Sequence, residues 1–301
     1  MGNAWAPEIV VEKELAITLI SKQFPAISIQ SIKEIGEGFD NTIFAVNDQY
    51  VFRFPRRKIA GDLIETEAVL LPIIHQILPI KIPVPVFFGK NSEEYKWSFL
   101  GYHYLSGMMP YKLAKEERTK LIRPLGEFLK SLHSISISQL KDLPIPYDTL
   151  GRLDIGKRKA GMAEKLETLL VLDNCSVFQK ARKYCLELEH IDVPKEHVLV
   201  HGDLHLRNML VNECKELTAV IDWGDVHIGH RAVDLSIVFS LIPADEREAF
   251  FAVYSEVDSL SLELAKFKSV YTLVLLLAYA ADKKERALYE EAKTSLAISL
   301  S

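Results

Sequence analysis

The sequence predicts an α+β fold in two lobes, a small N-terminal lobe built on an antiparallel sheet and a larger, mainly helical C-terminal lobe. Strand-like runs are concentrated in the first third, and helical spacing dominates the rest apart from a strand-rich island at residues 197–229. A length of 301 residues suits two domains or one domain with two lobes. The composition changes at residues 105–107, so we expect lobes of residues 1–104 and 105–301.

The elements of the first lobe follow from apolar spacing and turn residues. Two helices are expected, at residues 11–23 and 62–78. Asp62 is the expected N-cap of the second helix, and Pro72 should kink it. Five strands are expected, at residues 29–35, 42–46, 50–54, 84–89 and 97–104. Asn47 and Asp48 predict a turn between the second and third strands.

Helices are expected over residues 105–132 and from Asp234 to the end. The longest apolar stretch, Val270 to Ala281, has 12 residues. A membrane span takes about 20 residues, so this stretch predicts a buried helix and no membrane partner.

Charge and cysteine content exclude several classes of protein. The net charge of −5 and a pI near 6.0 give no basis for binding a polyanion, so nucleic acid is not expected as a partner. The three cysteines are odd in number and lack CxxC spacing, which argues against a disulfide framework and a thiolate zinc site and favours a cytoplasmic location. The oligomeric state stays open between monomer and dimer.

The island at residues 197–229 concentrates histidines and carboxylates, and three interpretations compete for it. In the first, five side chains are metal ligands of a hydrolase, since imidazole and carboxylate together suit zinc, manganese or iron: His201, Asp203, His205, Asp222 and His227. In the second, the histidines are structural and bonded to backbone groups.

The third interpretation uses the order of the residues. Asn208 follows Asp203 by five positions, and Asp222 follows it by nineteen, as in the protein-kinase-like catalytic core. Phosphoryl transfer needs one carboxylate beside the attacking hydroxyl, and a second carboxylate with an amide oxygen to hold Mg²⁺. A single loop supplies the base and one metal ligand only if they lie a few residues apart, as Asp203 and Asn208 do.

Neighbouring residues make this pattern more specific. The segment HGDLHLRN followed by IDWGD resembles the aminoglycoside phosphotransferase family, which carries glycine, here Gly202, where protein kinases carry arginine. Only 12 positions separate Asp222 from Asp234, too few for a regulated activation loop, which favours a small-molecule kinase. The motifs GEGFDNTIFAV, VFRFP, IPVPVFFGK and WSFLGYHYLSG follow the order of the aminoglycoside 2''-phosphotransferases, and the resemblance covers residues 30–240.

The resemblance implies roles for several of these residues and leaves His227 unassigned. Asp203 would orient and deprotonate the acceptor hydroxyl, and Asn208 and Asp222 would bind Mg²⁺. His201 is expected to brace the loop, and Asp234 to hold it through its backbone. His205 would lie near the phosphates or acceptor, or serve packing.

The resemblance also implies a nucleotide site in the first lobe, with ATP or GTP bound between the lobes. Arg53 stands where kinases carry lysine, and Glu67 is its expected partner in the following helix. The aromatic residues have ordinary core packing as an alternative role. The residues expected at the nucleotide are Gly36, Gly38, Arg53, Glu67, Phe99, Tyr102 and Tyr104.

The sequence therefore predicts a phosphotransferase that moves the γ-phosphoryl group of ATP or GTP to a hydroxyl of a small molecule. Aminoglycoside antibiotics are the leading acceptors, which would make the protein a resistance enzyme. A macrolide or a metabolite alcohol is the alternative acceptor. Two other classes remain open: a metal-dependent hydrolase using the histidine cluster, and a non-catalytic nucleotide-binding protein.

Overall fold

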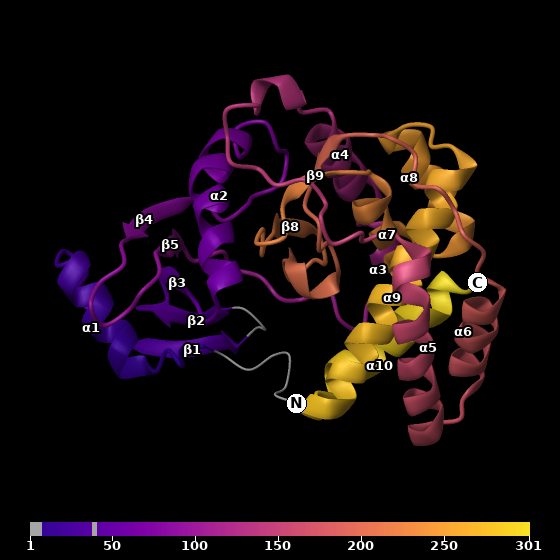
Figure 1. Cartoon of the computed structure of the whole chain (residues 1–301), viewed down its shortest axis with the longest axis horizontal. Helices are drawn as coiled ribbons and strands as arrows, with labels where there is room; N and C mark the ends of the chain where they lie inside the picture. Colours follow the sequence, from indigo (N-terminus) through magenta and orange to yellow (C-terminus); the bar gives the residue numbers. More distant parts are fainter. Residues whose placement is uncertain (1–7, 38–40) are drawn as a thin grey trace. The chain divides into compact units, whose positions relative to one another are not determined.

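A computed structural model describes residues 8–37 and 41–301, which form two compact units (Figure 1). The first unit contains the described residues up to Ser106 together with residues 141–145 and 220–225. The second unit contains residues 107–140, 146–219 and 226–301. Two short segments from later in the chain thus belong to the first unit, which the sequence did not predict.

A five-stranded antiparallel sheet forms the centre of the first unit, with strand order β1-β2-β3-β5-β4. The strands are β1 (Ile32–Glu37), β2 (Asn41–Val46), β3 (Tyr50–Pro55), β4 (Pro85–Gly89) and β5 (Phe99–His103). Asn47 and Asp48 both adopt positive φ, 56° and 52°, at the predicted turn between β2 and β3. This backbone suits the tight turn of a two-residue hairpin, and Asn and Asp tolerate it better than most residues.

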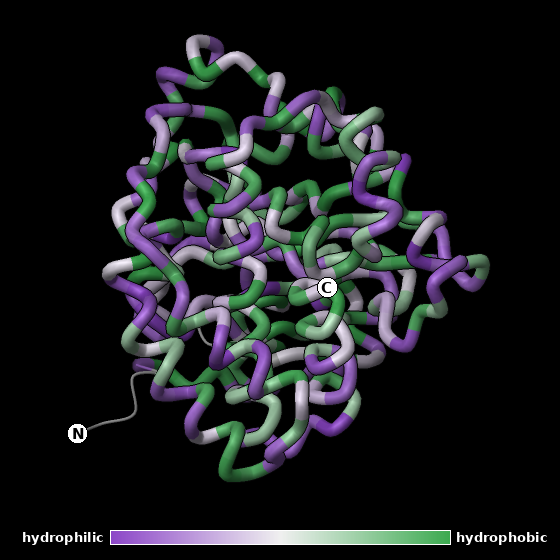
Figure 2. The backbone as a smooth tube through the Cα atoms, turned by 90° about the vertical axis from the view of Figure 1, so that its right-hand side faces the viewer, coloured by the Kyte–Doolittle hydropathy of each residue, from purple (hydrophilic) through white to green (hydrophobic). Residues whose placement is uncertain are grey.

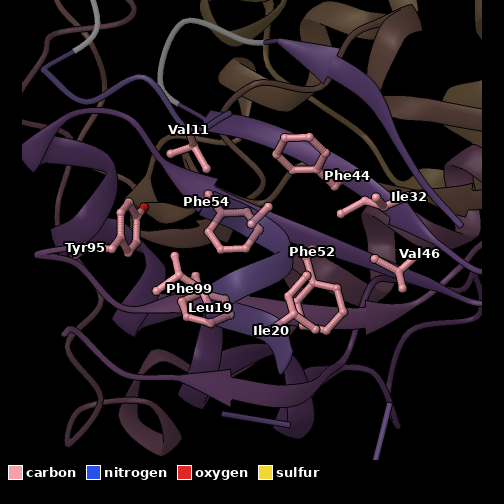
Figure 3. Close-up of a cluster of buried hydrophobic side chains, with 11 residues drawn as sticks. Val11, Leu19, Ile20, Ile32, Phe44, Val46, Phe52, Phe54, Tyr95 and Phe99 are labelled. Atoms are coloured by element: carbon pink, nitrogen blue, oxygen red, sulfur yellow. The ribbon is translucent and has the colours of Figure 1, made fainter. Parts of the chain in front are cut away.

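The two faces of this sheet are covered by different helices. Helix α1 (Lys13–Gln23) packs its Leu19 and Ile20 against an aromatic cluster on one face (Figure 3). In this cluster the rings of Phe54 and Phe99 stack with their centroids 4.6 Å apart. On the other face Ile64 of helix α2 (Lys58–Ile74) is clustered with residues of β5. Because successive side chains of a strand point to opposite faces, one set packs against α1 and the aromatic cluster and the other set packs against α2.

Helix α2 begins four residues earlier than the sequence predicted and ends at Ile74 rather than residue 78. Asp62 is not its N-cap but lies within the helix, where its carboxylate bonds Lys58 Nζ at 2.9 Å. Exposed i,i+4 pairs of this kind contribute only weakly to helix stability. Pro72 lies inside the helix as predicted.

Short strands in the second unit frame a loop at residues 201–208. Strand β6 (Val198–Val200) pairs with β9 (His227–Gly229), and β7 (Met209–Val211) pairs with β8 (Leu217–Val220), whose last residue belongs to the first unit. The loop leaves β6 and ends in a single 3₁₀ turn, Leu206–Asn208, directly before β7. Both of its ends are thus fixed by buried strands.

Helices make up most of the second unit. Apolar and polar residues alternate at short intervals along the chain (Figure 2), as expected for helices with one buried face. The helices are α3 (Lys115–Thr119), α4 (Ile122–His133), α5 (Ile155–Leu172), α6 (Ser176–Glu187), α7 (Ala232–Leu241), α8 (Arg247–Tyr254), α9 (Ser259–Lys283) and α10 (Arg286–Ser299). Short 3₁₀ turns lie at Ile137–Gln139 and Ala244–Glu246.

The apolar stretch at residues 270–281 belongs to a longer helix than the sequence predicted. Helix α9 has 25 residues, so by length and composition it is long enough to cross a membrane, and the length argument against a span is wrong. Half of its apolar window is buried, and it packs against α5, α7 and α10. These contacts are those of a core helix, as predicted.

Candidate active site

A buried carboxylate fixes the backbone at the start of the loop at residues 201–208. Asp234, in the first turn of α7, is fully buried and accepts hydrogen bonds from the backbone N–H of His201 at 2.7 Å and of Gly202 at 2.9 Å. His133 Nε2 lies 3.2 Å from the same carboxylate. Gly202 adopts φ 89°, which favours glycine. The predicted supporting role of Asp234 is confirmed.

Asp203 projects from this loop as a partly accessible carboxylate, with 37% of its side chain exposed. His205 Nε2 lies 3.3 Å from its Oδ2, while His205 Nδ1 accepts from the backbone N–H of Arg207 at 3.2 Å. Because Nδ1 accepts, the imidazole proton belongs on Nε2, where it points at Asp203. His205 is therefore placed against the expected catalytic carboxylate.

The surroundings of Asp203 favour its ionised form. Burial raises the pKa of Asp203, but the neighbouring His205, which also bonds its Oδ2, outweighs this together with Lys268 and His201, so the pKa lies below its usual range. His201 is fully buried and its Nδ1 accepts from the backbone N–H of Asp203 at 3.3 Å, which braces the loop as predicted. An ionised carboxylate can accept a hydrogen bond or a proton from a hydroxyl.

Asn208 is almost completely buried at the far end of the loop. Its Nδ2 donates to the backbone carbonyl oxygen of Asp203 at 2.8 Å, which fixes the amide plane. The bound nitrogen leaves the amide oxygen as the atom that can serve a cation. Amide and carboxylate oxygens are the donors that Mg²⁺ prefers, so the chemistry of Asn208 in the second unit and of Asp222 in the first is compatible with the predicted metal.

In the first unit, Arg53 joins two carboxylates. Its Nη1 contacts Glu67 Oε1 at 2.8 Å and Oε2 at 2.9 Å, and its Nη2 lies 3.1 Å from Asp222 Oδ1. The Glu67 side chain is 2% exposed and that of Asp222 is 49% exposed. The structure thus contains the ion pair expected between Arg53 and Glu67, and adds Asp222 to it.

Burial and charge have opposite outcomes for the two buried members of this group, Glu67 and Arg53. Burial raises the pKa of Glu67 to about 7, opposed by the charge of Arg53 and by the hydrogen bond that the Tyr102 hydroxyl donates at 3.3 Å. Burial lowers the pKa of Arg53, but the charges of Glu67 and Asp222 outweigh this and raise it above its ordinary value. The guanidinium therefore stays charged.

Two further contacts of Arg53 were not predicted. With the Asn41 amide turned so that its oxygen faces the guanidinium, that oxygen accepts from Arg53 Nε at 3.1 Å and Nη2 at 2.8 Å. Gly224 packs so closely that a Cβ there would lie 2.4 Å from Nη2. Asp222 adopts φ 62°, an uncommon conformation for a residue with a side chain. The IDWG segment, residues 221–224, therefore packs closely against the guanidinium of Arg53.

The other residues predicted at the nucleotide fall in different environments. Gly36 lies in β1 opposite Ile43 at an irregular register, and Gly38 lies outside the described residues. Phe99 is fully buried in the aromatic cluster, on the face opposite Leu100 and its partner Arg53, which is the core role that the sequence left open. Tyr104 is 42% exposed, and its backbone N–H is taken by the carbonyl of Gln49 at 2.8 Å.

The histidines of the island do not form the cluster that a metal-dependent hydrolase needs. Within residues 8–37 and 41–301, no group of three or more His, Cys, Asp or Glu side chains is arranged to hold a metal ion. His227 lies in β9 opposite Val200, and it lowers the pKa of Asp148. This removes the observation on which the hydrolase alternative depended.

Comparison with known proteins agrees with this geometry. Residues 31–266 match the phosphotransferase enzyme family. Among solved structures, the chain is similar to the GDP and kanamycin complex of APH(2'')-IIIa, with 25% identity and a TM-score of 0.68 over 95% of this chain and 98% of that one.

Two further solved structures share the fold at lower identity. The streptomycin–ATP–APH(2'')-IIa ternary complex is 20% identical, with a TM-score of 0.59 over 96% of this chain and 99% of that one. Macrolide 2'-phosphotransferase type I is 17% identical, with a TM-score of 0.58 over 96% of this chain and 98% of that one. The predicted kinase-like α+β fold is confirmed.

Proposed function

The chain belongs to the phosphotransferase enzyme family, and on this premise we propose that it transfers the γ-phosphoryl group of ATP or GTP to a hydroxyl of a small molecule. One observation carries the proposal: Asp203 is a partly exposed carboxylate, in surroundings that lower its pKa, on a loop whose backbone is fixed by buried Asp234. A carboxylate so placed is suited to orienting a hydroxyl nucleophile.

In the proposed reaction the acceptor oxygen bonds to the γ-phosphorus as the bond from that phosphorus to the bridging oxygen breaks. The hydroxyl proton passes to the Asp203 carboxylate, and a nucleoside diphosphate leaves. Asn208 and Asp222 would hold Mg²⁺, which when bound neutralises charge on the phosphates. His205 directs a proton at Asp203 Oδ2 and so fixes which carboxylate oxygen remains open to the acceptor.

On the donor side we propose that Arg53 binds the nucleotide phosphates while Glu67 holds its guanidinium in place. The backbones of Gly36 and Gly38 and the residues Tyr102 and Tyr104 complete the proposed nucleotide site. Intracellular nucleotide and three free cysteines together support a cytoplasmic location.

We propose an aminoglycoside as the leading acceptor, supported by the kanamycin complex of the 25% identical APH(2'')-IIIa. A macrolide is the second candidate, because Leu273 and Leu276 of α9 give the pocket beside the catalytic loop an apolar wall. An aminoglycoside acceptor would make the protein a resistance enzyme in cells.

The test is a panel of aminoglycosides, macrolides and simple alcohols, with ATP or GTP radiolabelled at the γ-phosphate and Mg²⁺. We expect a labelled acceptor from wild type. Asp203→Asn should lose at least about a hundredfold in kcat, the usual contribution of a positioned acid or base, while nucleotide affinity is kept. Nucleotide binding without any labelled acceptor would instead favour the non-catalytic alternative.

A further inference from the structure

The guanidinium of Arg53 is bound by three side chains of the protein itself. The two carboxylate oxygens of Glu67 lie 2.8 and 2.9 Å from Nη1. With its amide turned as described above, Asn41 accepts from Nε and from one N–H of Nη2. The second N–H of Nη2 is left for Asp222 Oδ1, which lies 3.1 Å from this nitrogen. Both N–H groups of Nη2 therefore have an acceptor.

The occupation of Nη2 matters because arginine binds a phosphate most specifically through two nitrogens at once. Such a fork pairs Nη2 either with Nε or with Nη1, so it always needs an N–H of Nη2. A phosphate can be bound in this way only if Asn41 or Asp222 leaves that nitrogen. The proposed role of Arg53 at the nucleotide therefore requires an exchange of partners.

The exposure of the partners decides which of them leaves. Asn41 is 8% exposed, and release of its amide oxygen would leave a buried polar atom without a donor, which is costly. The Asp222 side chain is 49% exposed, so water can solvate its carboxylate after release. Glu67 is buried and contacts Nη1 rather than Nη2, so it can stay in place. Asp222 is thus the partner that can be exchanged.

The charges around Arg53 link this exchange to the metal. Glu67, Asp222 and Asp225 set three carboxyl groups against one guanidinium, and Asp225 is close enough to raise the pKa of Arg53. An anionic phosphate adds to this excess of negative charge. A cation held by the released Asp222 would offset it, and a carboxylate together with phosphate oxygens is a usual ligand set for Mg²⁺. Binding of phosphate at Arg53 and of metal at Asp222 should therefore favour each other.

We infer that Arg53 exchanges Asp222 for a phosphate of the nucleotide, so that the Asp222 carboxylate becomes available to the metal as the nucleotide binds. The inference rests on the proposed phosphotransfer and deepens it by naming how the donor site is regulated. During the exchange Glu67 and Asn41 keep the guanidinium in place, and one N–H of Nη2 changes its acceptor from carboxylate to phosphate.

The experiment measures the affinity for ATP and for GTP by calorimetry in EDTA, so that no divalent metal contributes. Wild type is compared with Asp222→Asn and Asp222→Ala, which change a half-exposed side chain. Both variants lose a negative charge and should bind more tightly than wild type. Asparagine keeps an oxygen acceptor for Nη2, whereas alanine leaves that N–H to the phosphate. We therefore expect the alanine variant to bind at least about threefold more tightly than the asparagine variant, as one hydrogen bond allows.

Nucleosides control for effects that do not involve phosphate. Asp222 adopts φ 62°, a conformation that disfavours alanine, so this substitution could alter the site in other ways. Adenosine and guanosine carry no phosphate, and the two variants should bind each of them with equal affinity. The same threefold difference with the nucleosides would mean that phosphate is not its cause, and would overturn the inference.

Equal affinity of the two variants for the nucleotides in EDTA would also overturn the inference, while phosphotransfer by wild type would stand. The reverse case is a threefold difference with nucleotides alone in a protein that phosphorylates no acceptor. There the proposed function fails and the exchange at Arg53 is supported. If none of the three proteins binds ATP or GTP, both proposals fail.

Discussion

Arg53 shows how the identity of one side chain determines which neighbours it can bind at once. A guanidinium presents several donors in a fixed fork, whereas an ammonium is a compact point charge. Arg53 uses this fork to contact Glu67 through Nη1 and Asp222 through Nη2 at the same time. An ammonium at this position would lack the geometry to hold both carboxylates and Asn41 together.

We therefore expect Arg53→Lys to destabilise the protein although it conserves charge. Glu67 is buried, so weakening its partner should lower the free energy of unfolding by about 1–3 kcal/mol in urea denaturation. Glu67→Gln in the wild-type background is the matched control, because it removes the carboxylate and keeps Arg53. A lysine variant as stable as wild type would show that the fork geometry does not matter.

The buried carboxylate of Asp234 should make stability depend on pH. Burial raises the pKa of Asp234, but the hydrogen bond and charge of His133, the charge of His201 and the backbone N–H of Gly202 outweigh this and lower it. A carboxyl whose folded pKa lies below its unfolded value, about 3.9, stabilises the fold above that pH. The stabilisation is lost as the pH falls through the folded pKa.

The variant Asp234→Asn should therefore lose about 3 kcal/mol of unfolding free energy at pH 7, because buried donors lose a charged partner. Denaturation of both proteins between pH 7 and pH 3 should show the difference shrinking toward the acid end. A difference that stays constant over this range would mean that Asp234 has an unshifted pKa.

Much of the candidate site could be predicted from residues that lie close in sequence. Asp203, Asn208 and Asp222 were chosen by spacing, and their functional roles stay predictions. Asn41 was missed because its contact with Arg53 depends on the pairing of β2 with β3, and Lys268 was missed because it affects the pKa of Asp203 from a helix remote in the chain. No local pattern marks a lysine whose charge acts on a carboxylate about sixty residues away only because the chain is folded.

At the scale of elements, the strands were predicted to within a few residues because β-branched and aromatic residues alternate between turn residues. The start of α2 and the length of α9 were not predicted correctly from the sequence. Helix α2 begins at Lys58 without a side-chain cap, so the sequence offers no start signal. Polar residues such as Lys268 interrupt the apolar pattern of α9 although they are buried in it.

Close packing against α2 makes a specific prediction for Gly61. A Cβ at Gly61 would lie 2.6 Å from Cδ1 of Trp97, which is closer than atoms pack. We expect Gly61→Ala to lower the unfolding free energy by about 1–3 kcal/mol despite the better helix propensity of alanine. Gly161→Ala in α5 is the control, because nothing lies within 4 Å of its Cβ position.

The control should stabilise the protein by up to about 1 kcal/mol, since only helix propensity changes. Thermal or chemical denaturation of both variants measures the contrast. Equal effects of the two substitutions would show that Trp97 moves aside at no cost.

At the scale of the whole molecule, the order of motifs predicted the family, and the match over residues 31–266 confirms it. The assignment of two later segments to the first unit could not be predicted from the order of motifs. Residues 141–145 and 220–225 join the first unit through contacts formed only in the folded chain. Thr66 Oγ1 donates to the carbonyl of Pro144 at 2.8 Å, and the backbone N–H of Val220 donates to the carbonyl of Lys81 at 3.0 Å.

These contacts predict that the first unit cannot fold from its N-terminal sequence alone. A fragment of residues 1–106 lacks Trp223, which is fully buried, and Asp222, the partner of Arg53. Without them, apolar surface of the unit is exposed and a buried guanidinium loses one of its carboxylates. We expect the fragment to show no cooperative unfolding transition by circular dichroism, whereas the full chain does. A sharp transition in the fragment would mean that residues 1–106 are an independent domain.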